Sequence, residues 1–354
     1  MSVLDLARPN VRAVQPYSSA RMEASRGGVL LNANESPWPP FAAEDHDWNR
    51  YPDPQPDALI ERLASVYKVS PDQLLVGRGS DEAIDLLVRA FCSPGRDAIA
   101  ISPPTFGMYA VCARVQDAEV VSIPLDDNFH VDVEVLLSST TTNVKLVFLC
   151  TPNNPTGDVL TLDRIERVAR ELAGHALVIV DEAYIEFADT ASATTLLDRH
   201  ENVAVLRTLS KAWAMAGLRL GCLIANAEII ALLRRIMPPY PLPTPCVEAA
   251  LSALSDAGIA QARQRVAITV AERERVAAAL RNCAAILDVL PSRANFLTVR
   301  CFDPARLYRR LLNAGIVVRD VSHYAQLAQC LRFSIGTVSE NDRLLDTIRS
   351  VENS

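Results

Sequence analysis

The feature that most limits the fold of this chain is an alternation of two patterns between residues 70 and 225. Short apolar, β-branched runs alternate with longer stretches whose apolar residues recur at helical spacing. The runs are DAIAISP (97–103), VKLVFLC (144–150), ALVIVDE (176–182), NVAVLRT (202–208) and RLGCLIA (219–225). Strands that are apolar on both faces and separated by helices form a mostly parallel sheet with helices on both sides. An α/β fold is therefore predicted.

A proline-rich stretch, MPPYPLPTP (237–245), follows this alternation. It predicts a stiff connection or hinge, because proline fixes φ and cannot continue a helix. Beyond it, long helical patterns precede the short strand candidates ANFLTVR, GIVVRD and LRFSIG. At 354 residues the chain is long enough for two domains. We expect a large domain at 35–240 and a small α+β domain built from both chain ends, 1–34 and 241–354.

Charge and composition argue against several classes of function. The formal net charge of −7 provides no basic excess for binding nucleic acid or an anionic membrane surface. The chain shows no targeting segment, and no apolar run approaches the roughly 20 residues of a membrane span. Its eight cysteines form no CxxC pair and predict buried free thiols in a reducing compartment, so we expect a cytoplasmic protein. The dispersed histidines predict no metal site.

Polar motifs follow several of the predicted strands. They are TPNNPTG (151–157), DEAY (181–184) and TLSK (208–211). Ligands of open α/β sheets bind outside the carboxyl ends of the strands, so these motifs are the first candidates for a functional site.

Only three of the 35 basic residues are lysines, and Lys211 is the best placed for chemistry. It directly follows a strand, with Ser210 before it and Arg219 eight residues on. A lysine that forms a Schiff base needs a partly neutral amine, and desolvation near other cations lowers its pKa. Hydroxyls and an arginine beside it could bind a phosphate. Lys68, at a helix end, and Lys145, at the amino-terminal edge of a strand, are expected to be solvated surface residues.

Asp181 ends the strand ALVIVDE, and two functions fit an acid at that position. A Walker B carboxylate would require GxxxxGK[ST], and the chain contains no Gly-Lys pair. The carboxylate could instead pair with the protonated ring nitrogen of a pyridine cofactor, with Tyr184 bonding the ring hydroxyl. Without other context, a helix cap or a structural carboxylate is the better interpretation of Asp181.

GRGSDE (77–82) is a weak signal by itself. It lacks the third glycine of the GxGxxG fingerprint. Ser80 is a good N-cap for the helix that follows, and the free N–H groups of that helix could hold a phosphate. A simple helix start is as good an interpretation of these residues.

Taken in order, TPNNPTG, VDEAY and TLSKAWAMAGLRLG resemble the fold-type I aminotransferases that depend on pyridoxal 5′-phosphate (PLP). More narrowly, motifs along nearly the whole chain resemble the family of histidinol-phosphate aminotransferases. These motifs are PYSSAR (16–21), LNANE (31–35), RYPDPQP (50–56), RGSDE (78–82), PPTFGMY (103–109), DEAYIEF (181–187), YPLPTP (240–245), GIVVRD (315–320) and LRFSIGT (331–337).

The resemblance implies a PLP site made of residues from several motifs. Lys211 would bind the cofactor covalently, Asp181 would pair with the ring nitrogen, and Tyr184 and Asn154 would bond the ring oxygen. Tyr109 would stack on the ring face. The phosphate would be held by Ser80, Asp81, Ser210 and Arg219, with Thr208 close by. Tyr51 would reach the phosphate from the neighbouring subunit, which implies a homodimer.

For the substrate, the resemblance implies that Arg332 and Arg319 bind an anionic group and that Tyr17 and Asn34 lie nearby. An arginine within a strand could equally be only an ion-pair partner. The reaction implied is transamination between L-histidinol phosphate and 2-oxoglutarate, giving imidazole acetol phosphate and L-glutamate, in histidine biosynthesis. In that reaction Lys211 transfers the substrate Cα proton.

Three alternatives stay open at this point. They are an aromatic amino-acid aminotransferase, a PLP decarboxylase acting on threonine phosphate, and a PLP-binding regulator without turnover. The regulator would need a DNA-binding domain, for which the chain has no spare length or basic patch. Trp213, Pro243 and the segment VSHYAQLAQ (321–329) depart from the family pattern and make side-chain specificity the open question.

Overall fold

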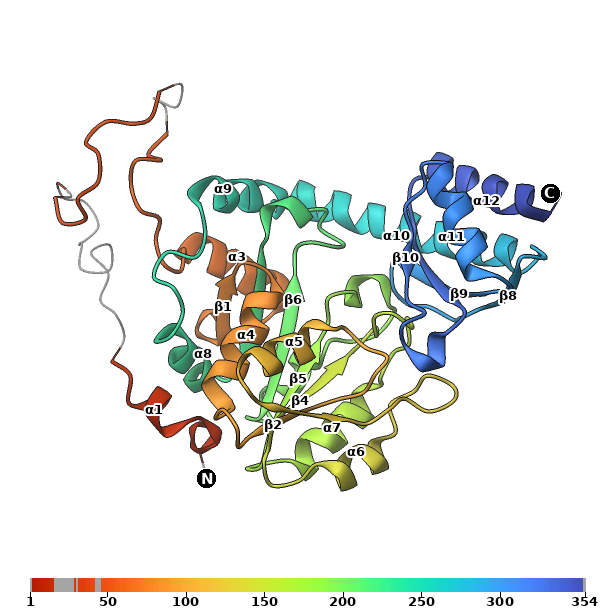
Figure 1. Cartoon of the computed structure of the whole chain (residues 1–354). Helices are drawn as coiled ribbons and strands as arrows, with labels where there is room; N and C mark the ends of the chain where they lie inside the picture. Colours follow the sequence, from red (N-terminus) through yellow and green to blue (C-terminus); the bar gives the residue numbers. More distant parts are fainter. Residues whose placement is uncertain (1, 16–28, 30, 42–45, 353–354) are drawn as a thin grey trace.

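Two sheets organise the computed structural model, which describes residues 2–15, 29, 31–41 and 46–352 (Figure 1). The larger sheet has seven strands in the order β1-β7-β6-β5-β4-β2-β3. Its strands are β1 (Leu74–Gly77), β2 (Ala98–Ile101), β3 (Glu119–Ser122), β4 (Val144–Cys150), β5 (Leu177–Asp181), β6 (Val203–Thr208) and β7 (Gly221–Ala225). Strands β2 to β6 run parallel, while β7 is antiparallel to both β6 and β1. All five strands predicted in this region are confirmed; β1 and β3 are additional.

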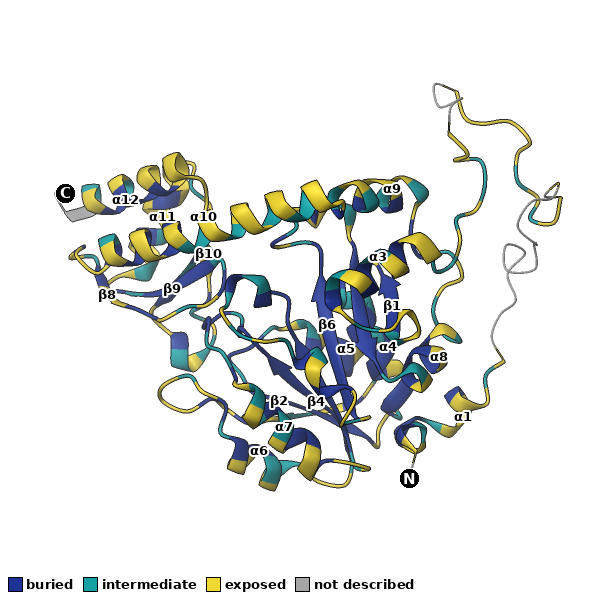
Figure 2. Cartoon of the chain, turned by 180° about the vertical axis from the view of Figure 1, so that it is seen from behind, coloured by how far each residue is buried: buried dark blue, intermediate teal, exposed yellow. Residues whose placement is uncertain are grey.

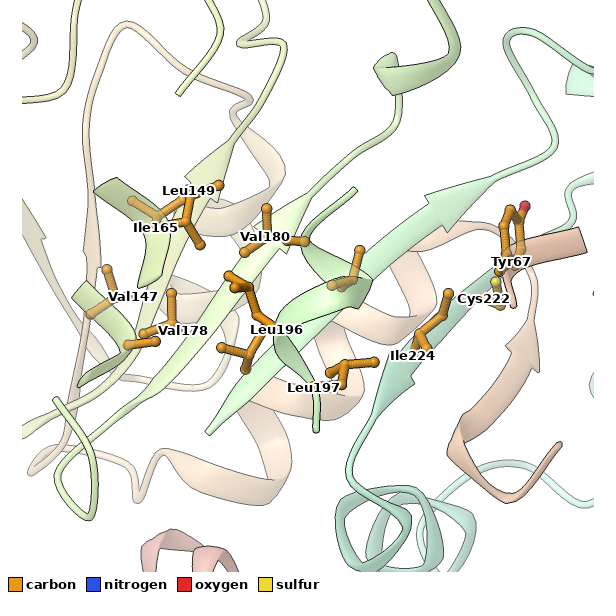
Figure 3. Packing of buried hydrophobic residues seen from close by; sticks show 14 of the residues in the cluster. Tyr67, Val147, Leu149, Ile165, Val178, Val180, Leu196, Leu197, Cys222 and Ile224 are labelled. Carbon is orange, nitrogen blue, oxygen red and sulfur yellow. The ribbon is translucent and has the colours of Figure 1, made fainter. Parts of the chain in front are cut away.

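Both faces of this sheet are buried over its central strands, because most positions of these strands are apolar. In β5, Val178 and Val180 face one side, while Leu177 and Ile179 face the other. The first side packs on α3 (Asp57–Tyr67), α6 (Val133–Ser139), α7 (Leu162–Glu171) and α9 (Thr244–Ala253), and Figure 3 shows part of this core. The second side packs on α4 (Ser80–Phe91), α5 (Met108–Val115) and α8 (Ala227–Arg234). The fold is thus the α/β fold that the alternation predicted, with helices on both faces.

The smaller sheet is antiparallel, in the order β10-β11-β9-β8. Its strands are β8 (Ile286–Val289), β9 (Phe296–Cys301), β10 (Arg319–Asp320) and β11 (Cys330–Ser334). One face packs on α11 (Pro304–Asn313), α12 (Val338–Glu352) and the end of α10 (Asp256–Leu280). Helix α10 runs from the large sheet to the small one (Figure 1), and its solvent side is exposed along most of its length (Figure 2).

The contacts of the chain ends differ from the expected domain limits. We expected residues 1–34 to join the small domain, but Val3 and Leu6 of a 3₁₀ turn (Val3–Leu6) and Val11 of α1 (Pro9–Arg12) pack in the core of the large sheet. The limit at 240/241 falls before α9, whose Val247 and Ala250 also belong to that core. Apolar side chains of the described N-terminal residues and of α9 thus pack against the large sheet.

Candidate active site

A pocket lies at the carboxyl ends of β4, β5 and β6, where the sequence placed its polar motifs. Its lining combines the motif residues with the start of α4: Gly79, Ser80, Asp81, Phe106, Cys150, Asn154, Asp181, Ala183, Tyr184, Thr208, Ser210, Lys211, Ala216 and Arg219. Parallel strands end at the same edge of a sheet, so residues far apart in the chain meet here.

Lys211 projects into this pocket from a tight loop after β6. Buried Leu209 anchors the loop, since its N–H donates to the Leu220 carbonyl at 3.0 Å and its carbonyl accepts from the Met215 N–H at 3.0 Å. Partial desolvation lowers the pKa of Lys211, and the positive charges of Arg332 and Arg219 lower it further. A larger fraction of neutral, nucleophilic amine results.

The other two lysines lie elsewhere, as predicted. Lys68 is the C-cap of α3, in the left-handed conformation, and Lys145 stands near the start of β4 with its Nζ donating to the Thr142 carbonyl at 3.0 Å. Lys211 is therefore the lysine at the candidate site.

Asp181 ends β5 at the base of the pocket and is 2% exposed. Its Oδ2 accepts a hydrogen bond from the Tyr109 hydroxyl at 2.6 Å, and its Oδ1 accepts one from the Ala183 N–H at 3.1 Å. Burial raises the pKa of Asp181, and these two bonds offset part of that effect. A cationic N–H donor in the pocket would stabilise the ionised carboxylate.

The opposite end of the pocket can bind an anion. Helix α4 begins at Ser80, after Gly79 with φ +86°, and its first turn presents backbone N–H groups. Arg219, in the left-handed conformation, places its guanidinium beside Asp81, with an Nη2–Oδ2 distance of 3.2 Å. A Cβ on Gly221 would lie 2.7 Å from the Ser80 nitrogen, so only glycine lets β7 approach the helix start this closely.

Two arginines of the small sheet line a second pocket, which shares Phe106 and Asn154 with the first. Arg319 and Arg332 are register partners on β10 and β11. Burial lowers the pKa of Arg332, and the positive charge of Arg319 lowers it further. Like charges directly opposite on neighbouring strands repel each other, so a bound anion would relieve this pair.

The sequence matches a family model, aminotransferase class I and II, over residues 26–348. A histidinol-phosphate aminotransferase of Xanthomonas euvesicatoria is 52% identical over 99% of this chain and 98% of its own length. One from Stenotrophomonas maltophilia is 54% identical over 97% of this chain and 95% of its own length. The chain belongs to the histidinol-phosphate aminotransferases. This family is a branch of the class I and II aminotransferases.

Solved structures agree with this assignment. The histidinol-phosphate aminotransferase of Clostridium acetobutylicum is 27% identical, with a TM-score of 0.78 over 86% of this chain and 91% of that chain. The histidinol-phosphate aminotransferase of Sinorhizobium meliloti, in complex with pyridoxal-5′-phosphate, is 28% identical. Its TM-score is 0.76 over 87% of this chain and 84% of that chain. An L-threonine-O-3-phosphate decarboxylase at 21% identity shows the fold alone.

PLP is the cofactor of this aminotransferase family, and the pocket suits it. The cofactor carries an aldehyde, a ring nitrogen and a phosphate. The pocket presents an amine of lowered pKa on Lys211, a buried carboxylate on Asp181 and the N-terminus of α4 with Arg219. These groups come from separate segments and lie around a single pocket, so the residues present fit the group.

Tyr109, which the resemblance expects to stack on the cofactor ring, is not among the residues that line the described pocket. It is fully buried behind the pocket, with its ring stacked on Phe148 at a centroid distance of 4.6 Å and its hydroxyl bonded to Asp181. Phe106 lines the pocket instead and meets Tyr109 edge-on at 5.5 Å. The sequence offered two aromatic residues in one motif, and only the helix start at Met108 decides which one faces the pocket.

Tyr184 and Asn154, both expected to bond the ring oxygen of the cofactor, line the pocket and contact each other. The Asn154 Nδ2 donates to the Tyr184 hydroxyl at 3.4 Å, and the Asn154 Oδ1 accepts from Arg332. The Tyr184 ring packs edge-on against Phe296 of the small sheet at 5.2 Å. Asn154 thus connects the ring-oxygen side of the pocket with the arginine pair.

The remaining predicted residues lie outside the Lys211 pocket. Asn34 and Tyr51 line a separate pocket with Pro243, and Tyr51 stacks on Tyr240 at a centroid distance of 4.4 Å. Tyr17 lies outside the described residues. Within the described ranges, no helix is both long and apolar enough to cross a membrane, and no group of His, Cys, Asp or Glu side chains is arranged to hold a metal ion.

Proposed function

We propose that this chain transfers the amino group of L-histidinol phosphate to 2-oxoglutarate, forming imidazole acetol phosphate and L-glutamate. The observation that carries the proposal is the junction of two pockets. The Lys211 pocket and the arginine pocket share Phe106 and Asn154. An amine held at Lys211 can therefore extend its anionic group to Arg332 and Arg319. Relatives at 50–54% identity carry the corresponding name.

The roles of the residues follow from their environment. Bound PLP supplies an aldehyde that condenses with amines and a ring that withdraws electrons from the substrate Cα. Lys211 would hold the aldehyde carbon and then, as a free amine, move the proton at the substrate Cα, since its lowered pKa favours the basic form. Asp181 would accept a hydrogen bond from the ring N–H and keep that proton in place. Tyr184 and Asn154 would bond the ring oxygen.

Several side chains would fix the cofactor at its phosphate end. Ser80 and Asp81 at the start of α4, Ser210 and Arg219 line that end of the pocket, and the Thr208 hydroxyl accepts from the Ser210 N–H at 3.2 Å. The backbone N–H groups of the helix and the guanidinium favour a dianion there.

One arginine site serves both substrates in this proposal. The phosphate of histidinol phosphate and a carboxylate of 2-oxoglutarate or glutamate are each planar or tetrahedral anions that a guanidinium can bind with two bonds. Arg332, which is half-buried, would make the main contact, and exposed Arg319 would add to it. Tyr17 and Asn34 are further substrate-side residues of the proposal.

The proposal includes a homodimer with shared active sites. Residues 31–41 lie away from both sheets in Figure 1. The exposed fractions of Leu31, Trp38 and Phe41 in this segment are 88%, 74% and 99%. Exposed apolar residues of this size indicate a protein contact. Tyr51, next to this segment, would reach the cofactor phosphate of the neighbouring subunit.

Mixing two inactive variants tests this sharing of residues. Lys211→Ala removes the amine, and Tyr51→Ala removes the contact expected to act across the dimer. In a mixed dimer one site combines an intact Lys211 with an intact Tyr51 only if Tyr51 acts in the other subunit. Recovery of activity after mixing and refolding supports the proposal, whereas activity no higher than that of Tyr51→Ala alone contradicts it.

Absorbance of the PLP-loaded protein tests the reaction itself. Addition of histidinol phosphate should abolish the visible absorbance band of the bound cofactor, and addition of 2-oxoglutarate should restore it. A response to phenylalanine or tyrosine without one to histidinol phosphate would indicate an aromatic aminotransferase. Carbon dioxide release from threonine phosphate would indicate a decarboxylase. Tight PLP binding without turnover of any amine would indicate a regulator.

The proposal also includes an expected compartment and an expected domain organisation. All eight cysteines are free, which suits a reducing compartment such as the cytoplasm. The chain would work as a larger and a smaller domain, with α10 joining the two.

A further inference from the structure

The segment 321–329, which did not match the family pattern, lies between the two sheets. We name it the bridging segment. Val321 and Leu327 anchor it to the small sheet in a cluster with Leu290 and Cys330, and Phe129 from the large domain packs against the same cluster. The segment contains a 3₁₀ turn (Ala325–Leu327) and leads directly into β11, which carries Arg332.

Two side chains of the bridging segment bond backbone carbonyls of the large domain. The Tyr324 hydroxyl donates to the Thr105 carbonyl at 2.6 Å, and the Gln326 Nε2 donates to the Leu125 carbonyl at 2.8 Å. Burial raises the pKa of Tyr324, so the phenol stays protonated and remains a donor. The two bonds join residues that are 219 and 201 positions apart in the sequence.

The hydrogen bond from Tyr324 ends on a buried residue next to the wall of the active site. Thr105 is 6% exposed, and its hydroxyl donates to the Asn153 Oδ1 at 2.8 Å. The next residue, Phe106, lines both the Lys211 pocket and the arginine pocket. Tyr324 itself lines the arginine pocket with Arg319 and Arg332. A single hydroxyl therefore connects the wall of the cofactor pocket with the anion site.

We propose that Tyr324 is a positioning residue that holds the arginine pair at a fixed distance from Phe106 and the Lys211 pocket. This inference rests on the proposed function of the arginine pair as the phosphate site. That distance sets which substrates can reach both the reacting amine site and the anion site. By joining the bridging segment to Thr105, the bond increases the population of the arrangement that is competent to bind.

Tyr324→Phe removes the hydroxyl and keeps the ring. A neutral hydrogen bond changes such a population by about two- to tenfold. In the PLP-loaded enzyme, the KM for histidinol phosphate and the dissociation constant of inorganic phosphate, measured by calorimetry, should rise by that same factor. The value of kcat and the visible spectrum of the cofactor should stay unchanged, because bound substrate at saturation restores the arrangement of the arginine pair and the Lys211 pocket. Amide exchange of residues 321–329 should become faster, and phosphate should slow it.

Two further variants complete the test. Tyr308→Phe, on α11 and partly buried against the core of the small sheet, is the matched control and should leave all these quantities unchanged. Gln326→Leu removes the other bond of the bridging segment and should raise the same constants, which keeps the inference testable if Tyr324→Phe folds poorly. Unchanged phosphate affinity in both bridging variants would overturn the inference, as would a lower kcat with an altered cofactor spectrum.

Failure of the proposed function would give a different result. Wild-type enzyme would not turn over histidinol phosphate, or Arg332→Gln would bind phosphate as well as wild type does. Phosphate binding that depends on Arg332 but not on Tyr324 would refute only the positioning role.

Discussion

Replacing Arg332 by glutamine should separate substrate binding from stability. Arg332 is half-buried on β11, directly opposite Arg319, and its Nη1 bonds the Asn154 side chain. Glutamine keeps a polar side chain that can still bond Asn154, and it removes one charge of the repelling pair. The substitution therefore removes the anion contact while leaving the strand pairing intact.

The magnitude follows from the number and kind of bonds that are lost. Hydrogen bonds to charged groups contribute roughly 1.5–3 kcal/mol each. Losing at least one such bond lowers kcat/KM for histidinol phosphate by roughly 10- to 150-fold. Arg319→Gln should have a smaller effect, because Arg319 is exposed and its interaction with an anion is screened. Relief of the like-charge pair contributes roughly 0.2–1 kcal/mol in favour of the folded state, so Tm should change little in Arg332→Gln.

Steady-state kinetics and thermal unfolding measure the two effects on the same PLP-loaded samples. Arg332→Lys is the matched control for charge, and it should recover only part of the activity because an ammonium cannot make two parallel bonds. If Arg332→Gln keeps kcat/KM for histidinol phosphate within about threefold of wild type, Arg332 makes none of the proposed contacts. A large fall in Tm would show that the residue is mainly structural.

Three other substitutions test the cofactor side of the site, and the pH dependence of PLP binding tests the electrostatics of Lys211. Lys211→Ala should abolish turnover, and borohydride treatment followed by mass spectrometry should find no cofactor attached to the protein; retained transamination would contradict the assignment. Asp181→Asn should lower kcat by roughly 10²–10³, because it removes the charge that holds the ring proton, while PLP still binds through its phosphate. Tyr109→Phe removes only the hydrogen bond to Asp181, so the protein should unfold at lower temperature with the visible band retained; an unchanged unfolding temperature would show that this bond contributes nothing to stability. The rate of PLP binding to apoprotein should rise with pH through a value below the usual lysine pKa of 10.5, since the neutral amine reacts. In Arg332→Gln this rise should move to higher pH, because one positive charge that lowers the Lys211 pKa is gone; an unchanged profile would argue against that cause.

Local sequence patterns identified the strands and the site because the relevant signals are local. Strands such as β5 and β6 begin with four consecutive apolar residues, which is enough to indicate a sheet covered on both faces. Asp181 and Lys211 stand directly after such strands, so the parallel arrangement alone brings them to one edge. Short strands with mixed residues escaped notice: β3 (Glu119–Ser122) lies at the sheet edge and β8 (Ile286–Val289) at the edge of the small sheet. Their pairing depends on a neighbour rather than on their own pattern.

The sequence by itself determined which residues end the strands, which lysine can react and which family motifs occur. Tertiary structure alone decided that Phe106 lines the pocket while Tyr109 is buried, because Phe106 lies in the loop before α5 and the Tyr109 ring, on the helix, packs on Phe148. It also decided that Arg332 reaches Asn154 and that Tyr324 reaches Thr105. Those contacts join segments separated by 178 and 219 residues, and no local pattern records them. Burial and long-range packing set such distances, whereas residue type and spacing set only which groups are available.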